Sequence, residues 1–177
     1  MIDLAAPMTG DGCRAEPLTQ AHREELRSAC AEDPDIWQIF PVSFAPDRFD
    51  ASFDALRARA GWIRFALYDG EAFVGMSCYL NLDASRQTLE IGSTFYRPSH
   101  CGSGFNARAK AMMLERAFDS GFRRVEFRVD KRNLRSQAAM AKLGAVREGV
   151  MRADRITWTG HVRDTVLFAI LKDEWPV

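Results

Sequence analysis

The stretch RPSHCGSGFNARAKAMM, residues 97–113, places two glycines and an asparagine where an expected strand meets an expected helix. Gly102 and Gly104 let the backbone bend tightly and approach a ligand closely. The first amides of a helix have no partner within the helix, and with the helix dipole they form a binding site for anions such as phosphate. The sequence therefore predicts either a phosphate-binding loop or a plain glycine-rich turn at residues 101–107.

A dinucleotide site is the first alternative to consider. Residues 102–107 (GSGFNA) fit the pattern G-x-G-x-x-[GA], and Glu126 lies where that pattern places an acidic residue. The surrounding chain argues against this alternative, because several expected strands precede the loop and too little chain follows it for a doubly wound sheet. A Walker P-loop is excluded here, since no Gly-Lys-Ser/Thr follows the glycines.

Length and composition indicate one ordinary globular domain, residues 1–177, without repeats or a long linker. The 24 basic and 24 acidic residues balance, so no overall field draws the chain to nucleic acid or to an anionic membrane. The four cysteines lie far apart, which argues against a disulfide scaffold or a metal site. No window resembles a signal peptide or a membrane span. We therefore expect a reduced, cytoplasmic protein.

The periodicity of apolar residues predicts a mixed α/β fold with a strand–helix–strand crossover in its middle. Strands are expected at residues 13–18, 62–69, 71–81, 88–96, 123–130, 146–153 and 163–171, and helices at 19–31, 48–60, 106–119 and 133–143, with an aromatic loop at 34–42. Short turn-like connections make the three strands before the loop antiparallel neighbours. The last strand is almost entirely apolar and is expected to be central.

Four segments together resemble the GNAT superfamily of acyl-CoA-dependent N-acetyltransferases. They are EIGSTFYRPS (90–99), GSGFNARAK (102–110), NLRSQAAMAKLGAVREGV (133–150) and RDTVLFAILKDEWP (163–176). The resemblance covers nearly the whole chain, is strongest over residues 90–176, and is closest to the RimJ/RimL-like branch of ribosomal-protein N-acetyltransferases. It implies a single-domain GNAT-like fold, with a central mixed, mostly antiparallel twisted sheet flanked by helices and an acyl-CoA-binding crossover.

The resemblance also implies acetyl-CoA as cofactor and transfer of its acetyl group to a primary amine, on a protein N-terminus or a small molecule. It places the cofactor on the loop, on the strand before it and at the start of the next helix. The implied cofactor-binding residues are Cys101, Gly102, Ser103, Gly104, Phe105, Asn106 and Ala107, then Ser93, Thr94 and Phe95, and finally Asn133, Arg135 and Ser136.

Several of these residues have an ordinary structural explanation as well. Asn133 is a favourable helix N-cap, and Asn106 could cap the preceding helix. Phe105 is of a type usually found in the core. The usual family pattern has Gln or Arg at the position of Cys101 and Gly or Ala at the position of Asn106, so two of its three specifying positions differ here.

The catalytic residues are less clearly marked than the loop. Many family members carry a tyrosine that protonates the departing thiolate, but that position here is Met140, which cannot donate a proton. Either another group donates it or the thiolate leaves unaided, as a thiol of pKa ~8.5 allows. Glu90 lies where the family sometimes places a general base, and a structural ion pair is the alternative.

The acceptor side of the site is inferred from Trp37, which is either a substrate contact or a core residue. An α-amino group, with a pKa of ~7.7–8.0, loses its proton more readily than a lysine near ~10.4. A site without an obvious strong base therefore suits a protein N-terminus or a small amine. The alternative function is an acyl-CoA-binding protein without turnover. The acceptor's identity and homodimer formation are left open.

Overall fold

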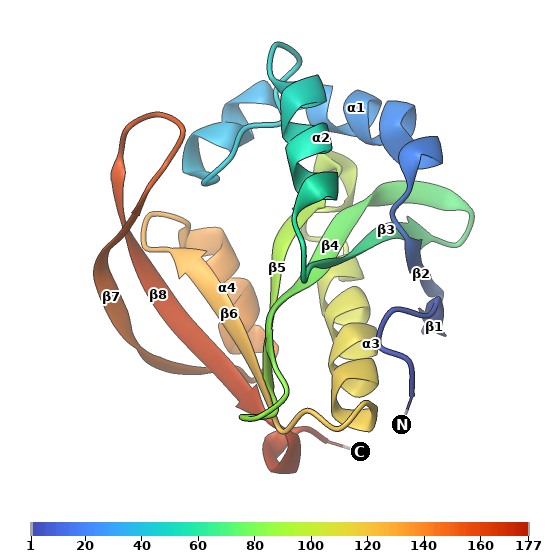
Figure 1. The fold of residues 1–177 in the computed structure, drawn as a ribbon, viewed down its shortest axis with the longest axis vertical. Coiled ribbons are helices and arrows are strands. Elements are labelled where there is room, and N and C mark those ends of the chain that lie inside the picture. The colour runs from blue at the N-terminus through green and yellow to red at the C-terminus, as the bar shows by residue number, and fades with distance from the viewer. Residues whose placement is uncertain (1, 177) are drawn as a thin grey trace.

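The computed structural model describes residues 2–176. The strands are β1 (Met8–Gly10), β2 (Cys13–Pro17), β3 (Ile63–Asp69), β4 (Ala72–Asp83), β5 (Thr88–Tyr96), β6 (Arg124–Asp130), β7 (Val146–Ile156) and β8 (Val162–Leu171). The helices are α1 (Arg23–Ala31), α2 (Phe49–Ala58), α3 (Phe105–Asp119) and α4 (Leu134–Lys142), with short 3-10 helices at Gln20–His22, Pro34–Ile39, Pro98–His100 and Lys172–Glu174. Every predicted strand and helix is present (Figure 1), although β1 was not predicted and residues 34–39 form a 3-10 helix within the expected loop.

A single eight-stranded sheet, in the order β1-β2-β3-β4-β5-β6-β8-β7, forms the centre of the fold. All neighbours are antiparallel except β5 and β6, which are parallel and are connected by α3. This connection is the predicted strand–helix–strand crossover. The apolar strand β8 was predicted to be central. It is paired on both sides, by β6 and β7, but it lies next to the edge of the sheet rather than at its centre.

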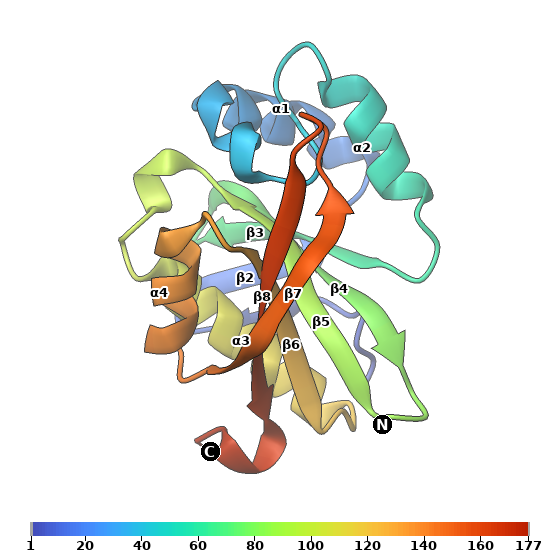
Figure 2. The same ribbon diagram turned by 90° about the vertical axis from the view of Figure 1, so that its left-hand side faces the viewer.

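The sheet has a hydrophobic core on each face, and the alternation of residues along β3 shows why. Phe65 and Leu67 belong to the core that packs under α3, whereas Ala66 and Tyr68 belong to the core under α1 and α2. Successive side chains of a strand point to opposite faces, so both faces are apolar and both are covered. In Figures 1 and 2, α1 and α2 lie together, apart from α3 and α4.

A β-bulge in β5 reverses this alternation part of the way along the strand. Ile91 packs in the core under α3, but Phe95 packs in the core under α1 and α2, although regular alternation would put both on one face. The register with β4 shifts here, and Ser93 has a positive φ of 49°. The extra residue of a bulge lets the strand change the faces to which its later side chains point. After the bulge, Thr94 therefore points toward α3.

The parallel pairing of β5 with β6 is short. Only Thr88–Glu90 pairs, with Arg124–Glu126. Beyond Glu90 and Glu126 the two strands no longer pair, while β5 continues beside β4 and β6 continues beside β8. The carboxyl ends of β5 and β6 therefore leave an opening in the sheet at the point where α3 begins.

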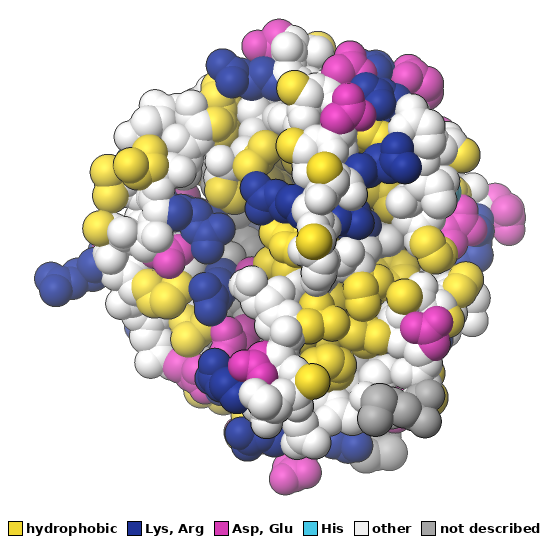
Figure 3. Space-filling model, in the orientation of Figure 1, with side chains coloured by type: hydrophobic (Ala, Val, Ile, Leu, Met, Phe, Trp, Pro, Cys, Tyr) yellow, Lys and Arg dark blue, Asp and Glu magenta, His cyan; other side chains and the backbone are white. Residues whose placement is uncertain are grey.

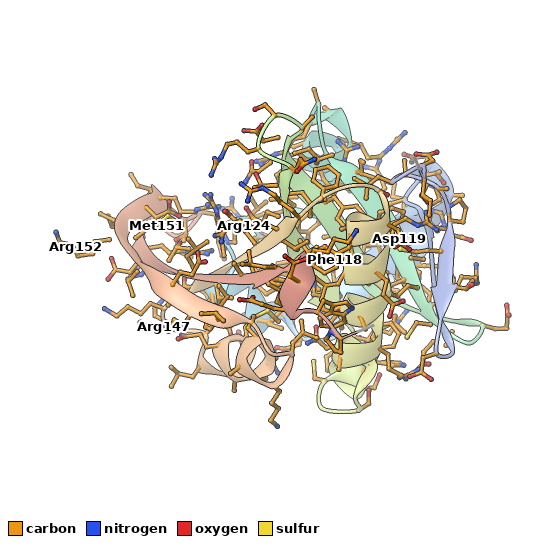
Figure 4. The ribbon with its side chains drawn as sticks, turned by 90° about the horizontal axis from the view of Figure 1, so that it is seen from below. Phe118, Asp119, Arg124, Arg147, Met151 and Arg152 are labelled. Carbon is orange, nitrogen blue, oxygen red and sulfur yellow. The ribbon has the colours of Figure 1, made fainter. Side chains whose placement is uncertain are left out.

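The far edge of the sheet is formed by β7, in which charged side chains alternate with apolar ones. Figure 4 shows Arg147, Met151 and Arg152 projecting from this edge, away from Phe118 and Asp119 at the end of α3. Charged side chains on an edge strand discourage pairing with another chain. The charged side chains of β7 therefore work against the pairing of a further strand with this edge.

We predict that Gly75→Ala destabilises the protein. A Cβ at Gly75 would lie 2.1 Å from the carbonyl oxygen of Phe95, so β4 and β5 would have to move apart beside the bulge. The expected loss in the free energy of unfolding is about 3 kcal/mol or more, measured by urea denaturation. Gly149→Ala in β7 is the matched control, because its Cβ would meet nothing within 4 Å, and it should change stability by less than about 0.5 kcal/mol. Equal effects in the two variants would contradict the packing described here.

Candidate active site

A cleft of about 710 Å³ occupies the opening between β5 and β6. Residues from both sides of the sheet line it, including Trp37, Glu90, Ser93, Thr94, Phe95, Cys101, Gly102, Asn106, Lys110, Asn133, Arg135, Ser136 and Met140. In the space-filling view a hollow contains hydrophobic side chains at depth and has Lys and Arg side chains around it (Figure 3). The cleft is large enough for a drug-sized ligand or part of a larger one.

Gly102 and Asn106 of the glycine-rich loop line this cleft, and the loop carries open backbone amides. Gly102 and Gly104 have φ values of 83° and 88°, and a Cβ built on either would meet no atom within 4 Å. The amides of Gly102, Ser103, Gly104 and Asn106 have no protein acceptor in the part of the chain that the structure describes. Unpaired amides at the start of a helix form a site for an anion.

The other three amides of residues 101–107 are already used within the protein. The Cys101 amide donates to the Pro98 carbonyl at 3.0 Å. The Phe105 amide donates to Ser103 Oγ at 3.3 Å, and the Ala107 amide donates to the Gly104 carbonyl at 3.1 Å. The Phe105 ring is fully buried and packs edge-on against Tyr96. Asn106 makes no capping bond, because Gly104 is the N-cap residue of α3. The idea that Asn106 caps this helix is therefore wrong.

The side chains of the loop differ in their access to the cleft. Cys101 is half-buried and lines the cleft, and its sulfur lies 3.8 Å from the Arg97 carbonyl oxygen. Ser103, Gly104, Phe105 and Ala107 are not among the residues that line the cleft. If these four residues contact a cofactor, they do so through the backbone.

The N-terminus of α4 lines the opposite wall. Asn133 Oδ1 accepts a hydrogen bond from the Ser136 amide at 3.0 Å, so Asn133 is the N-cap of α4. Asn133, Ser136 and the exposed Arg135 all line the cleft. Capping uses the side-chain oxygen of Asn133 and leaves its NH₂ group free to donate. Met140, one helical turn further on, is 4% exposed and adds an apolar surface.

Glu90 lies in the cleft with two polar neighbours. Its Oε2 accepts a hydrogen bond from Asn81 Nδ2 at 2.7 Å and lies 3.3 Å from Arg128 Nε. Burial raises the pKa of the Glu90 carboxyl, while Arg128 and Asn81 act in the opposite direction. A buried carboxyl with a raised pKa is a better proton acceptor than an ordinary surface carboxylate.

Trp37 forms an apolar wall of the cleft on the side of α1 and α2. Its indole N–H donates to the Cys30 carbonyl at 3.1 Å, and its ring stacks on Phe95 with ring centres 5.0 Å apart. The side chain is fully buried. Because the side chain has no exposed surface and its polar atom is satisfied, Trp37 is a core residue that borders the cleft rather than an exposed contact.

Sequence reasoning missed Lys110, which lines the cleft from α3. The lysine is 3% exposed, and its Nζ lies 2.6 Å from Thr94 Oγ1 and 3.2 Å from Ser77 Oγ. Burial lowers the pKa of this ammonium to about 7. A signal was present in the sequence, because Lys110 lies three residues before Met113 on the buried stripe of α3 and interrupts it with a charge.

Comparison with known proteins identifies the family. The Acetyltransferase (GNAT) domain matches residues 14–146, so the chain belongs to the GNAT acetyltransferase family. A provisionally named acetyltransferase from T. thermophilus is 33% identical, with a TM-score of 0.90 over 99% of this chain and 94% of that one. A GCN5-related N-acetyltransferase from Brucella melitensis is 25% identical, with a TM-score of 0.88 over 97% and 81% of the two chains.

A more distant similarity concerns the fold alone. Mycobacterium smegmatis RimJ, solved in complex with CoA-disulfide, is 22% identical, with a TM-score of 0.80 over 97% of this chain and 88% of that one. No curated protein matches the chain significantly. The mixed α/β GNAT fold is thus confirmed, and the family's general activity is acyl-CoA-dependent acetyl transfer.

We predict that Gly92→Ala displaces the Glu90 carboxylate without unfolding the protein. A Cβ at Gly92 would lie 2.9 Å from Glu90 Oε1, and this flexible side chain can move away. The displacement should disturb the Glu90–Asn81 hydrogen bond and lower acetyl transfer at least tenfold, while the urea midpoint changes little. Carboxyl NMR of Glu90 in both proteins checks the displacement. An unchanged Glu90 signal would show that Gly92 does not hold the carboxylate in place.

Proposed function

We propose that this protein is an acetyl-CoA-dependent N-acetyltransferase that moves the acetyl group directly to a primary amine, on a protein N-terminus or a small molecule. The observation that carries the proposal is the position of the open loop amides. Gly102 and Asn106, which carry two of the four open amides, line the same cleft as the buried carboxyl of Glu90. An anion site and a proton acceptor in one cleft are the two parts that such a transfer requires.

Successive parts of the cleft would bind successive parts of coenzyme A. The free amides of Gly102, Ser103, Gly104 and Asn106 would hold the diphosphate, with the dipole of α3 adding to the attraction. The β5 segment Ser93–Phe95 and the α4 residues Asn133 and Ser136 would hold the pantetheine arm from its two sides. Arg135 is exposed at the mouth, where its fork suits a phosphate.

Glu90 would accept the proton of the acceptor amine, directly or through a water molecule. An α-amino group with a pKa of ~7.7–8.0 is partly neutral near pH 7, so it needs little help from the base. Orientation of two bound reactants in one cleft supplies up to roughly 7–11 kcal/mol of the acceleration. Trp37 and Phe95 would keep the acceptor side of the cleft apolar and exclude water.

The second candidate is an acyl-CoA-binding protein of the same fold with little or no turnover. Met140 favours it, because this buried residue supplies no proton for the departing thiolate. Release of free thiol from acetyl-CoA, followed with a thiol reagent across a panel of amines, separates the two functions. Saturable binding of coenzyme A without release for any amine would favour the binding protein.

The proposal also covers the branch of the family, the binding partner and the location of the protein. The RimJ/RimL-like branch is supported only by the resemblance of the sequence and by the similarity of the fold to RimJ. The partner would be an amine-bearing acceptor rather than nucleic acid or a membrane, and a homodimer is compatible with the structure. Among residues 2–176, no helix is long and apolar enough to cross a bilayer. A cytoplasmic location is proposed from the sequence alone.

Gly104→Glu should abolish binding of coenzyme A, because a carboxylate would project into the space that the diphosphate is proposed to take. We expect at least a hundredfold rise in Kd, measured by isothermal titration calorimetry. Gly121→Glu is the matched control, since Gly121 lies at the other end of α3 with a φ of 95° and nothing within 4 Å of its Cβ. Both variants carry similar backbone strain. If Gly104→Glu binds coenzyme A with wild-type affinity, the loop is only a turn and does not hold the diphosphate.

Glu90→Gln should lower kcat/KM most where the acceptor amine is largely protonated. We expect a loss of about 10²-fold near pH 7, the usual size of a general-base contribution. The loss should shrink as the pH rises past the pKa of the amine, ~7.7–8.0, because the amine is then already neutral. Steady-state rates from pH 5.5 to pH 9.5 measure this dependence. If the pH–rate profiles of the variant and the wild type coincide, Glu90 is not the base.

A further inference from the structure

Lys110 is a buried cation that the transfer outlined above does not use. It extends from α3 toward the sheet, where its Nζ contacts Thr94 Oγ1 on β5 at 2.6 Å and Ser77 Oγ on β4 at 3.2 Å. The two hydroxyls are themselves 2.7 Å apart. Three polar atoms thus form a closed triangle below the β5 bulge, on the wall of the cleft.

No carboxylate balances the charge of Lys110. Among residues 2–176, no Asp or Glu oxygen lies within 4.0 Å of its Nζ. The titratable groups whose charges act on it are Cys78 on β4 and Glu90 on β5, and burial is the dominant influence. Burying an unpaired ammonium is costly, and methionine or leucine would fill the same space without that cost. Proteins commonly keep such an unfavourably buried charged residue at functional sites.

The hydrogen bonds of Lys110 leave one proton available. An ammonium has three N–H donors, and the hydroxyls of Ser77 and Thr94 accept two of them. The third N–H has no acceptor in the described part of the chain. Since Lys110 lines the cleft, this donor can serve a group that enters the cleft.

Lys110 and Glu90 approach the cleft from opposite faces of the sheet. Leu89 and Ile91 belong to the core under α3, so Glu90 between them points to the face of α1 and α2. Lys110 lies on the α3 face, five residues after the first residue of α3 and thus ~7.5 Å along the helix axis from the loop. It therefore lies on the side of the loop, where the coenzyme would enter.

Other groups of the cleft are less well placed than Lys110 to protonate the leaving group. His100 and Cys101 line the cleft, but they directly precede the loop proposed to hold the diphosphate, away from the thioester end of the cofactor. Met140 cannot donate a proton. The hydroxyl of Tyr96 is buried and has no hydrogen-bond partner among the described residues, but burial raises the pKa of Tyr96 far above neutrality. Near neutral pH, Lys110 holds its proton weakly enough to release it, because burial lowers its pKa to about 7.

We propose that Lys110 protonates the sulfur of the departing coenzyme. This inference rests on the proposed acetyl transfer. The protonated acceptor amine first gives one proton to Glu90. Its neutral nitrogen then bonds to the acetyl carbon and loses a second proton to solvent, and the carbon–sulfur bond breaks with its electron pair on sulfur. One ammonium proton of Lys110 then moves to that sulfur and leaves a neutral amine. A proton passes from Glu90 through solvent to Lys110, so the products are the N-acetylated amine and free coenzyme A.

The test compares Lys110→Met with the wild type and with Lys142→Met, in which an exposed lysine at the end of α4 is replaced. For Lys110→Met we expect kcat to fall about 10²-fold or more, KM for acetyl-CoA to change less than threefold, and the thermal midpoint to stay the same or rise. In the wild type, kcat should decline as the pH rises above about 7, the pKa of Lys110. That decline should be missing from the residual activity of Lys110→Met.

Two further variants separate a proton donor from a structural residue. Lys110→Gln can still hydrogen-bond the hydroxyls of Thr94 and Ser77 but releases no proton, so it should lose as much kcat as Lys110→Met. Tyr96→Phe should retain kcat within about threefold. If Lys110→Gln keeps wild-type kcat, or if Tyr96→Phe takes away the pH-dependent decline, Lys110 is not the donor.

A binding measurement gives an independent readout. An ammonium beside the sulfur should favour the thiolate, so below about pH 7, where Lys110 is still charged, a larger fraction of the thiol of bound coenzyme A should be ionised in the wild type than in Lys110→Met. Ultraviolet absorbance of the thiolate during a pH titration follows this ionisation. Equal titrations in the two proteins would overturn the inference while leaving acetyl transfer by the wild type intact. A wild type that binds coenzyme A but transfers no acetyl group would overturn the proposed function as well.

Discussion

The separation of β5 from β6 after only three residue pairs is the constraint on which the site depends. Beyond Glu126, β6 still pairs with β8 as far as Asp130, and beyond Glu90, β5 still pairs with β4. Each strand therefore keeps one paired edge and turns its other edge toward the opening. Backbone N–H and C=O groups on such edges need partners. The amide groups of a pantetheine arm are of the right chemical type to provide them, and the cleft is thus a consequence of sheet geometry rather than of any single side chain.

The bulge at Ser93 then determines what surrounds that opening. By inserting one residue into β5, it turns Thr94 toward α3 and Phe95 toward Trp37. The face under α3 receives the polar group formed by Thr94 and Lys110 and adjoins the loop, while the opposite face receives Glu90 and the aromatic wall. A donor and an acceptor of an acetyl group can therefore approach from different sides and meet only in the gap. In the proposed transfer, the two substrates would therefore stay on opposite sides of the sheet until they meet in this gap.

Most of the fold could be predicted from the sequence. Apolar residues recur with a clear period within its helices and strands, and glycines mark where several of these elements end. The crossover around α3 and the pairing of β8 on both sides follow from such patterns. The three-residue strand β1 was missed because so short a segment has no measurable periodicity. The bulge at Ser93 was missed as well, since nothing in the run TLEIGSTFY marks the extra residue, and its position depends on the register with β4.

The candidate site was predictable in part. The loop glycines and the capping role of Asn133 could be derived from local rules, whereas the use of the Phe105 and Ala107 amides within the loop required coordinates. Lys110 was overlooked because a lysine on a helix is usually solvated. Its burial becomes visible only when α3 is packed on the sheet.

The most direct measurement of the central claim is a titration of the ¹⁵N-labelled protein with coenzyme A, followed by amide NMR. If the loop cradles the diphosphate, the amides of Gly102, Ser103, Gly104 and Asn106 should shift downfield together at saturation, because each gains a charged acceptor. The amides of Gly121 and Gly160, which lie in other turns, should remain in place. Saturable binding that leaves the four loop amides unshifted would contradict the account.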